Sequence, residues 1–240
     1  STETRAALAP KGKLRVAFLS APIYVSKDAA TGELRGVAVD LGKDLAQRAS
    51  VLFDPVVYAS FPELMNGAKS GQWDVALMGV DAQRATVVDF SAPFMNVEQG
   101  YLVRAGVQIA AASDVDVPGV RVGVLEKSSL DILLSQTLKN AAIVRARTLA
   151  ENYALLDAGK TDVMAATKPA LFAGAVSRPG AQVLDGRFPV DAIGIGIPKG
   201  RDAAAAAYIV KFVEEAKAEG LVKSAIERAG LLGVVVAPLK

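Results

Sequence analysis

The hydrophobic pattern of this chain alternates between short apolar runs and longer amphipathic stretches. Apolar runs bounded by glycine or polar residues predict buried β-strands, and apolar residues at helical spacing predict helices. The expected strands cover residues 14–19, 53–58, 75–78, 101–103, 120–125, 143–146, 162–166, 182–184 and 193–197. The expected helices cover residues 37–49, 61–69, 129–139, 149–158, 169–177, 202–219 and 221–229, after a flexible lead-in at 1–12. This alternation predicts an α/β protein with parallel-rich sheets and helices on both faces.

The same pattern occurs twice along the chain. A Gly-x-x-Asp-Val sequence leads from a helix into an apolar strand at Gly71–Val75 and again at Gly159–Val163. An Arg-Val pair opens the first strand of each half, at Arg15–Val16 and at Arg121–Val122. Turn chemistry alone explains part of this echo, because helix-to-strand turns favour a glycine and a polar residue. Together with the restart of the pattern after Gly106, the echo favours two similar Rossmann-like lobes.

The order of elements indicates that the last helices return to the first lobe, so that two chain crossings act as hinge strands. Gly194 and Gly196 lie in the second crossing. Glycine there either absorbs backbone rotation or lets sheet layers approach closely, and both interpretations stay open. The expected boundaries are residues 1–104 with 192–240 for lobe 1, residues 105–191 for lobe 2, and hinges near 103–106 and 190–196.

Composition narrows the classes of function. The 240 residues are 52% hydrophobic, which is ample for a folded core of one large or two smaller domains. With 27 basic and 25 acidic residues the net charge is +2, and there is no dense basic patch of the kind that binds nucleic acid. No apolar run reaches the roughly 18 residues that a membrane-spanning helix requires.

The chain contains neither cysteine nor histidine. This excludes a thiol nucleophile, a Ser–His–Asp triad, an imidazole base and zinc sites built on cysteine or histidine. Carboxylate chemistry stays open. We expect no metal, no cofactor and no catalytic residue. The chain starts at Ser1, which a removed leader peptide or a trimmed sequence would each explain.

The most informative stretch is Gly71–Phe94, which reads GQWDVALMGVDAQRATVVDFSAPF. A strand runs into a short loop containing Gly79, and a helix is expected to start with Asp81 as its N-cap and Arg84 in its first turn. Helix starts offer backbone N–H groups without helical partners, and arginine adds a planar fork of donors. This combination is suited to binding a small carboxylate.

Six segments, taken in order, resemble the extracellular solute-binding proteins of family 3, the receptors of polar amino-acid ABC importers. The resemblance covers about residues 13–230, and its most specific block is D-F-S-x-P-F after an Arg-Ala pair. It implies the type II periplasmic binding protein fold, in which two lobes joined by two hinge strands close on one small solute. The segments read GELRGVAVDLGKDLAQRA (32–49), SGQWDVALMG (70–79), QRATVVDFSAPF (83–94), VRVGVLEKSS (120–129), TDVMAATKPAL (161–171) and IGIGIPKG (193–200).

The resemblance implies roles for particular residues. Arg84 matches the arginine that pairs with the ligand α-carboxylate, although it would otherwise read as a surface ion-pair residue. Ser128 and Ser129 match the second carboxylate clamp, and either also suits a plain helix N-cap. Phe61 matches the aromatic that stacks on the ligand, with packing into the core as its alternative. Tyr24 is a weaker aromatic candidate.

The chain departs from the family pattern at three places. The loop before Arg84 is about two residues shorter, and Asp81 stands where a threonine usually caps the helix. Asp81 is expected to cap, and could instead meet a ligand ammonium. Thr167, followed by Lys168, stands where an aspartate usually pairs with the ligand α-amino group.

The third departure bears on the ligand. An ammonium buried without an anionic partner costs on the order of several kcal/mol. Either Asp81 or Glu98 supplies the missing charge, or the ligand has no ammonium. A small organic acid with a second anionic group near Lys168 then fits, and Lys168 equally reads as a solvated lysine.

We therefore expect a periplasmic, monomeric binding protein whose leader has been removed. It would capture an amino acid or related carboxylate between Arg84 and the serines at 128–129, and the membrane subunits of an ABC importer would sense closure. One alternative is an enzyme like the cyclohexadienyl dehydratases, for which Asp81, Glu98 and Glu126 are the available acids. Another is the ligand-sensing domain of a receptor.

Overall fold

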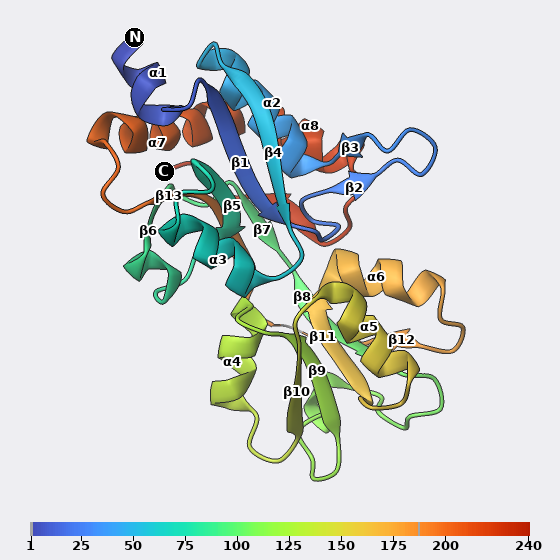
Figure 1. Cartoon of the computed structure of the whole chain (residues 1–240). Coiled ribbons are helices and arrows are strands. Elements are labelled where there is room, and N and C mark those ends of the chain that lie inside the picture. Colours follow the sequence, from blue (N-terminus) through green and yellow to red (C-terminus); the bar gives the residue numbers. More distant parts are fainter. Residues whose placement is uncertain (1, 187) are drawn as a thin grey trace. The chain divides into compact units, whose positions relative to one another are not determined.

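The computed structural model describes residues 2–186 and 188–240, which form two compact units. Unit 1 comprises Ser1–Tyr58, Pro62–Asn96 and Ala192–Lys240, and unit 2 comprises Ala59–Phe61 and Val97–Asp191. Each unit is a mixed α/β layer structure with its own sheet (Figure 1).

Unit 1 is built on a seven-stranded sheet in the order β14-β7-β13-β5-β1-β4, with β6 paired to β13. Strand β1 runs parallel to both β4 and β5. Strand β13 returns antiparallel to β5, with Gly194 opposite Met78. The strands are β1 (Lys13–Leu19), β4 (Leu52–Tyr58), β5 (Val75–Gly79), β6 (Val88–Phe90), β7 (Met95–Val97), β13 (Asp191–Pro198) and β14 (Val234–Val236), beside a separate hairpin of β2 (Ser26–Lys27) and β3 (Leu34–Arg35).

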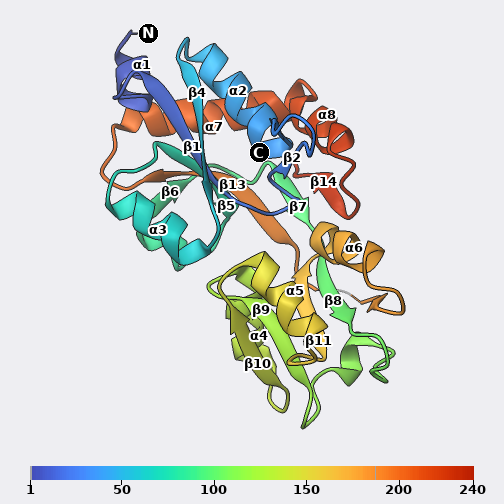
Figure 2. The same cartoon turned by 45° about the vertical axis from the view of Figure 1, so that its right-hand side comes forward.

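Helices cover both faces of the unit 1 sheet, which agrees with the continuous burial of its central strands β1 and β5. On one face Ala76 and Met78 pack with Leu64 and Ala68 of α3. Helix α2 contacts β1 and β4 and packs on α8, while α7 packs on α1 and α8 (Figure 2). The helices are α1 (Thr2–Leu8), α2 (Val37–Arg48), α3 (Phe61–Lys69), α7 (Ala203–Ala218) and α8 (Leu221–Arg228), with a short 3-10 helix η1 (Arg84–Thr86).

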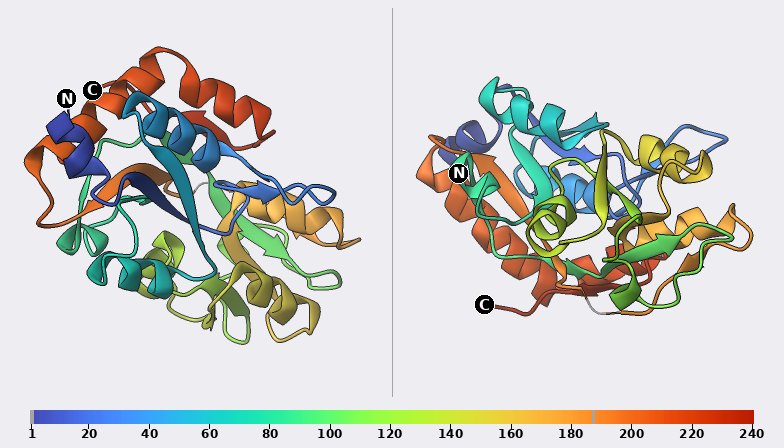
Figure 3. Two further views of the ribbon diagram at one scale, coloured as in Figure 1. Left: turned by 45° about the horizontal axis from the view of Figure 1, so that its top comes forward. Right: turned by 90° about the horizontal axis from the view of Figure 1, so that it is seen from below.

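Unit 2 has a five-stranded sheet in the order β10-β9-β11-β8-β12. Alternate residues of β11 face opposite layers: Val163 and Ala165 pack with α4, whereas Met164 and Ala166 pack with α5 and α6. Figure 3 shows the same ribbon from two further directions. The elements are β8 (Gln99–Val103), η2 (Ala112–Asp114), β9 (Arg121–Leu125), α4 (Ser129–Thr137), β10 (Ala142–Ala146), α5 (Leu149–Asp157), β11 (Val163–Thr167), α6 (Lys168–Val176) and β12 (Gln182–Val183).

The repeated sequence pattern corresponds to an arginine–aspartate ion pair that occurs once in each unit. In unit 1 Asp74 accepts hydrogen bonds from the backbone N–H, Nε and Nη2 of Arg15 at 2.9, 3.0 and 2.8 Å. In unit 2 Asp162 accepts the same three from Arg121 at 2.9, 3.1 and 2.8 Å. Each unit therefore contains an arginine–aspartate clamp, to which the Gly-x-x-Asp-Val turn contributes the aspartate and the Arg-Val strand start contributes the arginine. The clamp joins the beginnings of two neighbouring parallel strands.

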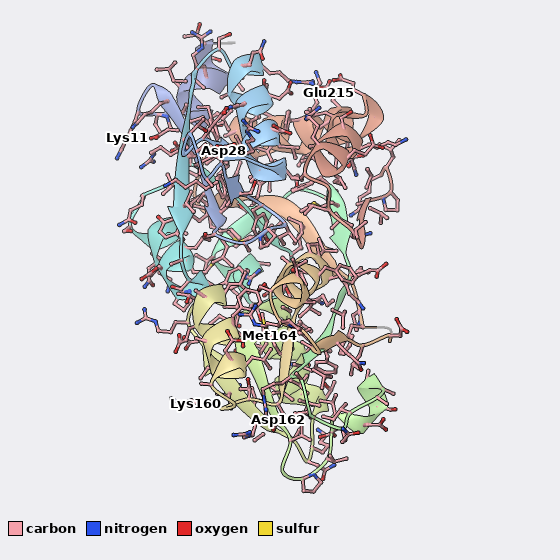
Figure 4. All side chains as sticks on the ribbon, turned by 90° about the vertical axis from the view of Figure 1, so that its right-hand side faces the viewer. Lys11, Asp28, Lys160, Asp162, Met164 and Glu215 are labelled. Atoms are coloured by element: carbon pink, nitrogen blue, oxygen red, sulfur yellow. The ribbon has the colours of Figure 1, made fainter. Side chains whose placement is uncertain are left out.

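A second arginine completes each clamp. Arg201, which follows the antiparallel strand β13, lies 3.4 Å from Asp74, and Arg104, which follows β8, lies 3.2 Å from Asp162. The unit 1 clamp is the more deeply buried, since the side chain of Asp74 is 0% exposed and that of Asp162 is 14% exposed. Figure 4 labels Asp162 at the start of β11 and Met164 two residues further along the strand.

The α/β class and the two-lobed arrangement are confirmed, but four local predictions are wrong. The expected lead-in contains helix α1, because Leu8 is buried and Arg201 donates to the carbonyl oxygen of Ala7. The expected helix after Asp81 is only the three-residue η1. The short strands β6, β7 and β14 were not predicted. The sheets are mixed, because β8 and β13 run antiparallel to their neighbours.

The first boundary between the units also differs from the expected one. The chain passes from unit 1 into unit 2 at Val97, whereas the sequence predicted a crossing near 103–106. The reason is that β8 pairs with β11 and so belongs to unit 2. In the second crossing, a Cβ on Gly194 would lie 2.9 Å from Val80 Cγ2, so close packing explains that glycine. Hinge motion at either crossing stays a prediction.

The Asp162 clamp predicts a dependence of stability on pH. Hydrogen bonds from Arg121 lower the pKa of Asp162 to about 2. The folded-state pKa lies below the unfolded value, so the stabilisation is complete above about pH 5 and is lost as pH falls towards 2. We expect Asp162→Asn to reduce the free energy of unfolding by about 1–2 kcal/mol at pH 7, allowing for solvent screening, and the difference to shrink towards pH 2.

Circular dichroism in urea at several pH values measures this effect. Fluorescence is unsuited to unit 2, because the chain's single tryptophan, Trp73, is buried in unit 1. The exposed Asp185→Asn is the matched control and should change stability by less than about 0.5 kcal/mol. A difference for Asp162→Asn that stays constant between pH 7 and pH 2.5 would contradict the assignment.

Gly36, which precedes α2, predicts a second effect on stability. Its φ is 132°, and an added Cβ would lie 2.6 Å from the carbonyl oxygen of Tyr24. Gly36→Ala should therefore lower the free energy of unfolding by about 2 kcal/mol or more. Gly220→Ala, at a φ of 81° with open space around the Cβ position, should cost about 1–2 kcal/mol and serves as control. Trp73 fluorescence during urea unfolding measures the stability of both variants. Equal losses of unfolding free energy in Gly36→Ala and Gly220→Ala would contradict the steric argument.

Candidate functional site

Arg84 of unit 1 is held by the loop that follows β5. Its backbone N–H donates to Asp81 Oδ1 at 2.8 Å, and its Nε lies 3.1 Å from Asp81 Oδ2. Its Nη1 donates to the carbonyl oxygen of Gly79 at 2.9 Å. The side chain is only 5% exposed. Gly79, Asp81 and Arg84 therefore form one compact group at the carboxyl end of β5.

This geometry explains the short loop. Asp81 caps the turn as expected, and the same carboxylate is the ionic partner of Arg84, which the sequence analysis did not foresee. Because the guanidinium is fixed at two of its nitrogens by neighbours in its own loop, little side-chain entropy remains to be lost on binding an anion. Asp81 is the ionic partner of Arg84. That Asp81 also meets a ligand ammonium stays a prediction.

The D-F-S-x-P-F block is structural. Ser91 donates its backbone N–H to the carbonyl oxygen of Ile195 at 2.9 Å, and its Oγ accepts the Ile195 N–H at 3.0 Å. The N–H of Phe94 donates to the carbonyl oxygen of Ile193 at 2.8 Å. Asp89 pairs with Lys199 at 2.7 Å. The block thus fastens β13 to the segment that follows Arg84.

Ser128 and Ser129 lie together at the start of α4 in unit 2. Ser128 is the N-cap, and its Oγ accepts the N–H of Asp131 at 3.1 Å. Lys127, just before it, has a left-handed φ of 61° and donates its N–H to Asp131 Oδ2 at 2.9 Å. The N–H groups of Ser129 and Leu130 have no backbone acceptor among the residues that the structure describes. Such N–H groups at a helix start favour an anion.

Charge at this helix start is partly balanced within unit 2. Asp131, which is 5% exposed, also accepts from Nε of Arg145 at 2.9 and 3.1 Å and from the hydroxyl of Ser135 at 3.2 Å. Its carboxylate is therefore part of the scaffold that fixes the loop. It does not act as an independent acceptor for a ligand.

A second carboxylate, Asp191, reaches the same helix and was missed by the sequence analysis. Ser129 Oγ donates to Asp191 Oδ1 at 2.7 Å. Gln99, which is buried, donates to the carbonyl oxygen of Pro189 at 2.9 Å and holds this segment against β8. The only sequence signal was an acidic residue inside the predicted second crossing.

Thr167, Lys168 and Glu98 are neighbours where β11 ends. Thr167 is the N-cap of α6 without a side-chain cap bond, and the N–H of Lys168 donates to the carbonyl oxygen of Glu98 at 2.8 Å. The Lys168 side chain is buried, and its Nζ donates to the carbonyl oxygen of Leu184 at 3.0 Å. Lys168 is therefore not a solvated lysine. Glu98 is exposed.

The two aromatic candidates are both buried. Phe61, the first residue of α3, is 7% exposed, and Tyr24, in the loop before the β2–β3 hairpin, is 1% exposed. The carbonyl oxygen of Tyr24 accepts the N–H of Ala38 at 3.0 Å, which ties this loop to α2. Stacking of either ring on a ligand stays a prediction.

The candidates thus form a group around Arg84 in unit 1, a group around Ser128 and Ser129 in unit 2, and a third group where β11 ends. Within the described ranges no cluster of three or more acidic residues is placed to hold a metal ion. In the same ranges no helix is long and apolar enough to cross a bilayer. The three groups contain hydrogen-bonding and ionic side chains and the starts of helices α4 and α6.

Comparison with known proteins gives a consistent result. The chain is 23% identical over 189 residues to the ABC transporter glutamine-binding protein GlnH of Bacillus subtilis (strain 168), covering 76% of this chain and 68% of that protein. It is 24% identical over 205 residues to a glutamine-binding protein of Geobacillus stearothermophilus, covering 82% and 77%.

Solved structures share the fold. A mutant of ArgBP from T. maritima has a TM-score of 0.81 at 24% identity, covering 95% of this chain and 99% of that one. The ancestral amino acid-binding protein AncCDT-1, described as a precursor of cyclohexadienyl dehydratase, has a TM-score of 0.80 at 25% identity, covering 94% and 98%. The α/β class with two lobes of the type II periplasmic binding proteins is thereby confirmed.

The family model agrees with both comparisons and spans nearly all of the described elements. It matches residues 14–229, from β1 through the end of α8. The chain belongs to the bacterial extracellular solute-binding proteins, family 3.

Proposed function

We propose that this protein captures a small amino acid outside the cytoplasm and delivers it to the membrane subunits of an ABC importer. Two curated relatives named as glutamine-binding proteins support the solute class. The observation that carries the proposal is the fixed guanidinium of Arg84, since a planar fork held in place suits the carboxylate that every amino acid carries.

The proposal assigns one ligand to two half-sites. Arg84 binds the α-carboxylate from unit 1, and the start of α4, with Ser128 and Ser129, binds from unit 2. Closure of the lobes on the ligand then follows, because a solute that contacts both half-sites stabilises the closed state by its differential affinity. The mechanism is capture and release, so no covalent step is required.

Arg84 provides the direct test. Arg84→Ala should weaken amino-acid binding by about 100-fold or more, because the bound carboxylate then loses a charged partner. Arg84→Lys keeps the positive charge but loses the planar pair of donors, so its affinity should lie between those of the wild-type protein and Arg84→Ala. Titration calorimetry measures both, after a thermal-shift screen of amino acids, dicarboxylates and aromatic acids, since a ligand that binds only the folded form raises the melting temperature.

The exposed Arg35 supplies a matched control. It pairs with Asp28 and Glu33 on the β2–β3 hairpin, and Arg35→Ala should leave affinity within about threefold. Near wild-type affinity in Arg84→Ala would remove Arg84 from the site. A screen in which no amino acid shifts the melting temperature would contradict the proposed solute class.

A dehydratase activity is the second candidate, because AncCDT-1, itself named an amino acid-binding protein, is described as a precursor of cyclohexadienyl dehydratase. Of its possible acids, Asp81 is paired with Arg84, and Glu98 is exposed. We expect incubation with prephenate or arogenate, followed by chromatography, to yield no product above a protein-free blank. Turnover that Glu126→Gln abolishes would establish an enzyme instead.

A further inference from the structure

The internal repeat aligns a layer of buried residues in unit 1 with a layer of different chemistry in unit 2. The alignment follows the two Gly-x-x-Asp-Val turns, whose glycine and aspartate N–H groups donate to equivalent carbonyl oxygens in both units. The strands that open with Arg15 and Arg121 are aligned in the same way. The corresponding residues are Ala17, Leu64 and Trp73 in unit 1 and Gly123, Asn152 and Thr161 in unit 2.

In unit 1 this layer is apolar and internally satisfied. Ala17, Leu64 and Trp73 belong to one buried hydrophobic cluster. The indole N–H of Trp73 donates to the carbonyl oxygen of Leu64 at 2.9 Å. The indole nitrogen is the one polar side-chain atom of these three residues, and it is therefore paired.

In unit 2 the layer is polar, and its side-chain polar atoms have no partner in the protein. Asn152 and Thr161 are both 0% exposed. Across residues 2–186 and 188–240, no protein atom forms a hydrogen bond with Asn152 Oδ1, Asn152 Nδ2 or Thr161 Oγ1. Burial of an amide and a hydroxyl without partners is strongly unfavourable, and buried polar groups in proteins are nearly always paired with the protein or with an ordered water.

The atoms concerned surround one place in the layer. A Cβ on Gly123 would overlap Asn152 Oδ1 and would lie 3.5 Å from Thr161 Oγ1, so one small molecule can reach both oxygens. Thr161 is much smaller than the aligned Trp73, and Leu155, aligned with Gly67, offsets only part of this difference in volume. The layer in unit 2 is therefore less filled by side chains than its counterpart.

A direct bond between the two side chains would satisfy the layer only in part. The Asn152 amide carries both an acceptor oxygen and two N–H donors, whereas the Thr161 hydroxyl has a single proton. A water molecule donates two hydrogen bonds and accepts two, so it can bond to the amide and to the hydroxyl together. Both groups are uncharged, which favours water over an ion.

We propose that Asn152 and Thr161 hold an internal water molecule between α5 and the sheet of unit 2, in the layer that Trp73 fills in unit 1. Figure 4 labels Lys160 and Asp162, the two chain neighbours of Thr161, next to the start of β11. The water site therefore adjoins the residue that carries the unit 2 clamp. It belongs to the scaffold and does not depend on the proposed function.

A high-resolution crystal structure of the wild-type protein tests the site directly. We expect a density peak within hydrogen-bond distance of both the Asn152 amide and Thr161 Oγ1, and no peak at the aligned place beside Trp73. A direct Asn152–Thr161 hydrogen bond without a water, or an Asn152 amide turned onto another protein group, would overturn the proposal.

Stability measurements test the same site in solution. Thr161→Val and Asn152→Leu should each raise the equilibrium constant for unfolding by about 5- to 30-fold, because the polar group that remains loses part of its pairing. The double variant leaves no polar side chain to satisfy, so its effect should be at least about fivefold smaller than the product of the two single effects. Circular dichroism in urea measures all three variants.

A control and a second readout complete the experiment. Thr137→Val, at the exposed end of α4, should change the unfolding constant by less than about twofold. Magnetic relaxation dispersion of solvent water detects long-lived internal waters, and the double variant should lose the contribution of one. Single effects that simply multiply in the double variant, or an unchanged dispersion, would count against the water site. The wild-type crystal structure decides the question if a variant does not fold.

Discussion

The twofold arginine–aspartate clamp is the constraint on which the rest of the structure depends. Asp74 joins the beginnings of β1 and β5, and Asp162 joins those of β9 and β11. Parallel strands whose starts are fixed in register also end together, and in α/β sheets ligands bind beyond those carboxyl ends. The loop carrying Arg84 follows β5, and the loop carrying Ser128 follows β9. An arginine–aspartate ion pair at one end of each sheet thereby positions the polar residues at the other end.

The two units share this framework but differ in the chemistry at its far end. Beyond β5, a carboxylate and a carbonyl oxygen fix the guanidinium of Arg84. Beyond β11, the corresponding basic residue is Lys168, whose ammonium donates to Leu184 inside unit 2. Asp191, at the start of β13, accepts the hydroxyl proton of Ser129 in unit 2. One repeated framework therefore carries a guanidinium fixed within its own loop in unit 1 and a lysine turned into the fold in unit 2.

Similarity of fold does not define the solute. The relatives described above are 23–25% identical to this chain, and two of them are named as glutamine-binding proteins. Binding energy in such a site depends on a few side chains, and a single missing charge changes which ligands are tolerated. Ligand pairs that differ by one ammonium address this question directly.

The sequence by itself determined the α/β class, the internal repeat and the family, because strand periodicity, turn glycines and the family motifs are local signals. Tertiary structure alone decided that Asp81 pairs with Arg84, that Lys168 turns into unit 2, and that Asp191 meets Ser129. It also decided that the chain's first residues form a helix, since Arg201 contacts them across 194 positions of sequence. Such contacts join residues far apart in the chain or depend on side-chain direction, and neither is encoded in a local pattern.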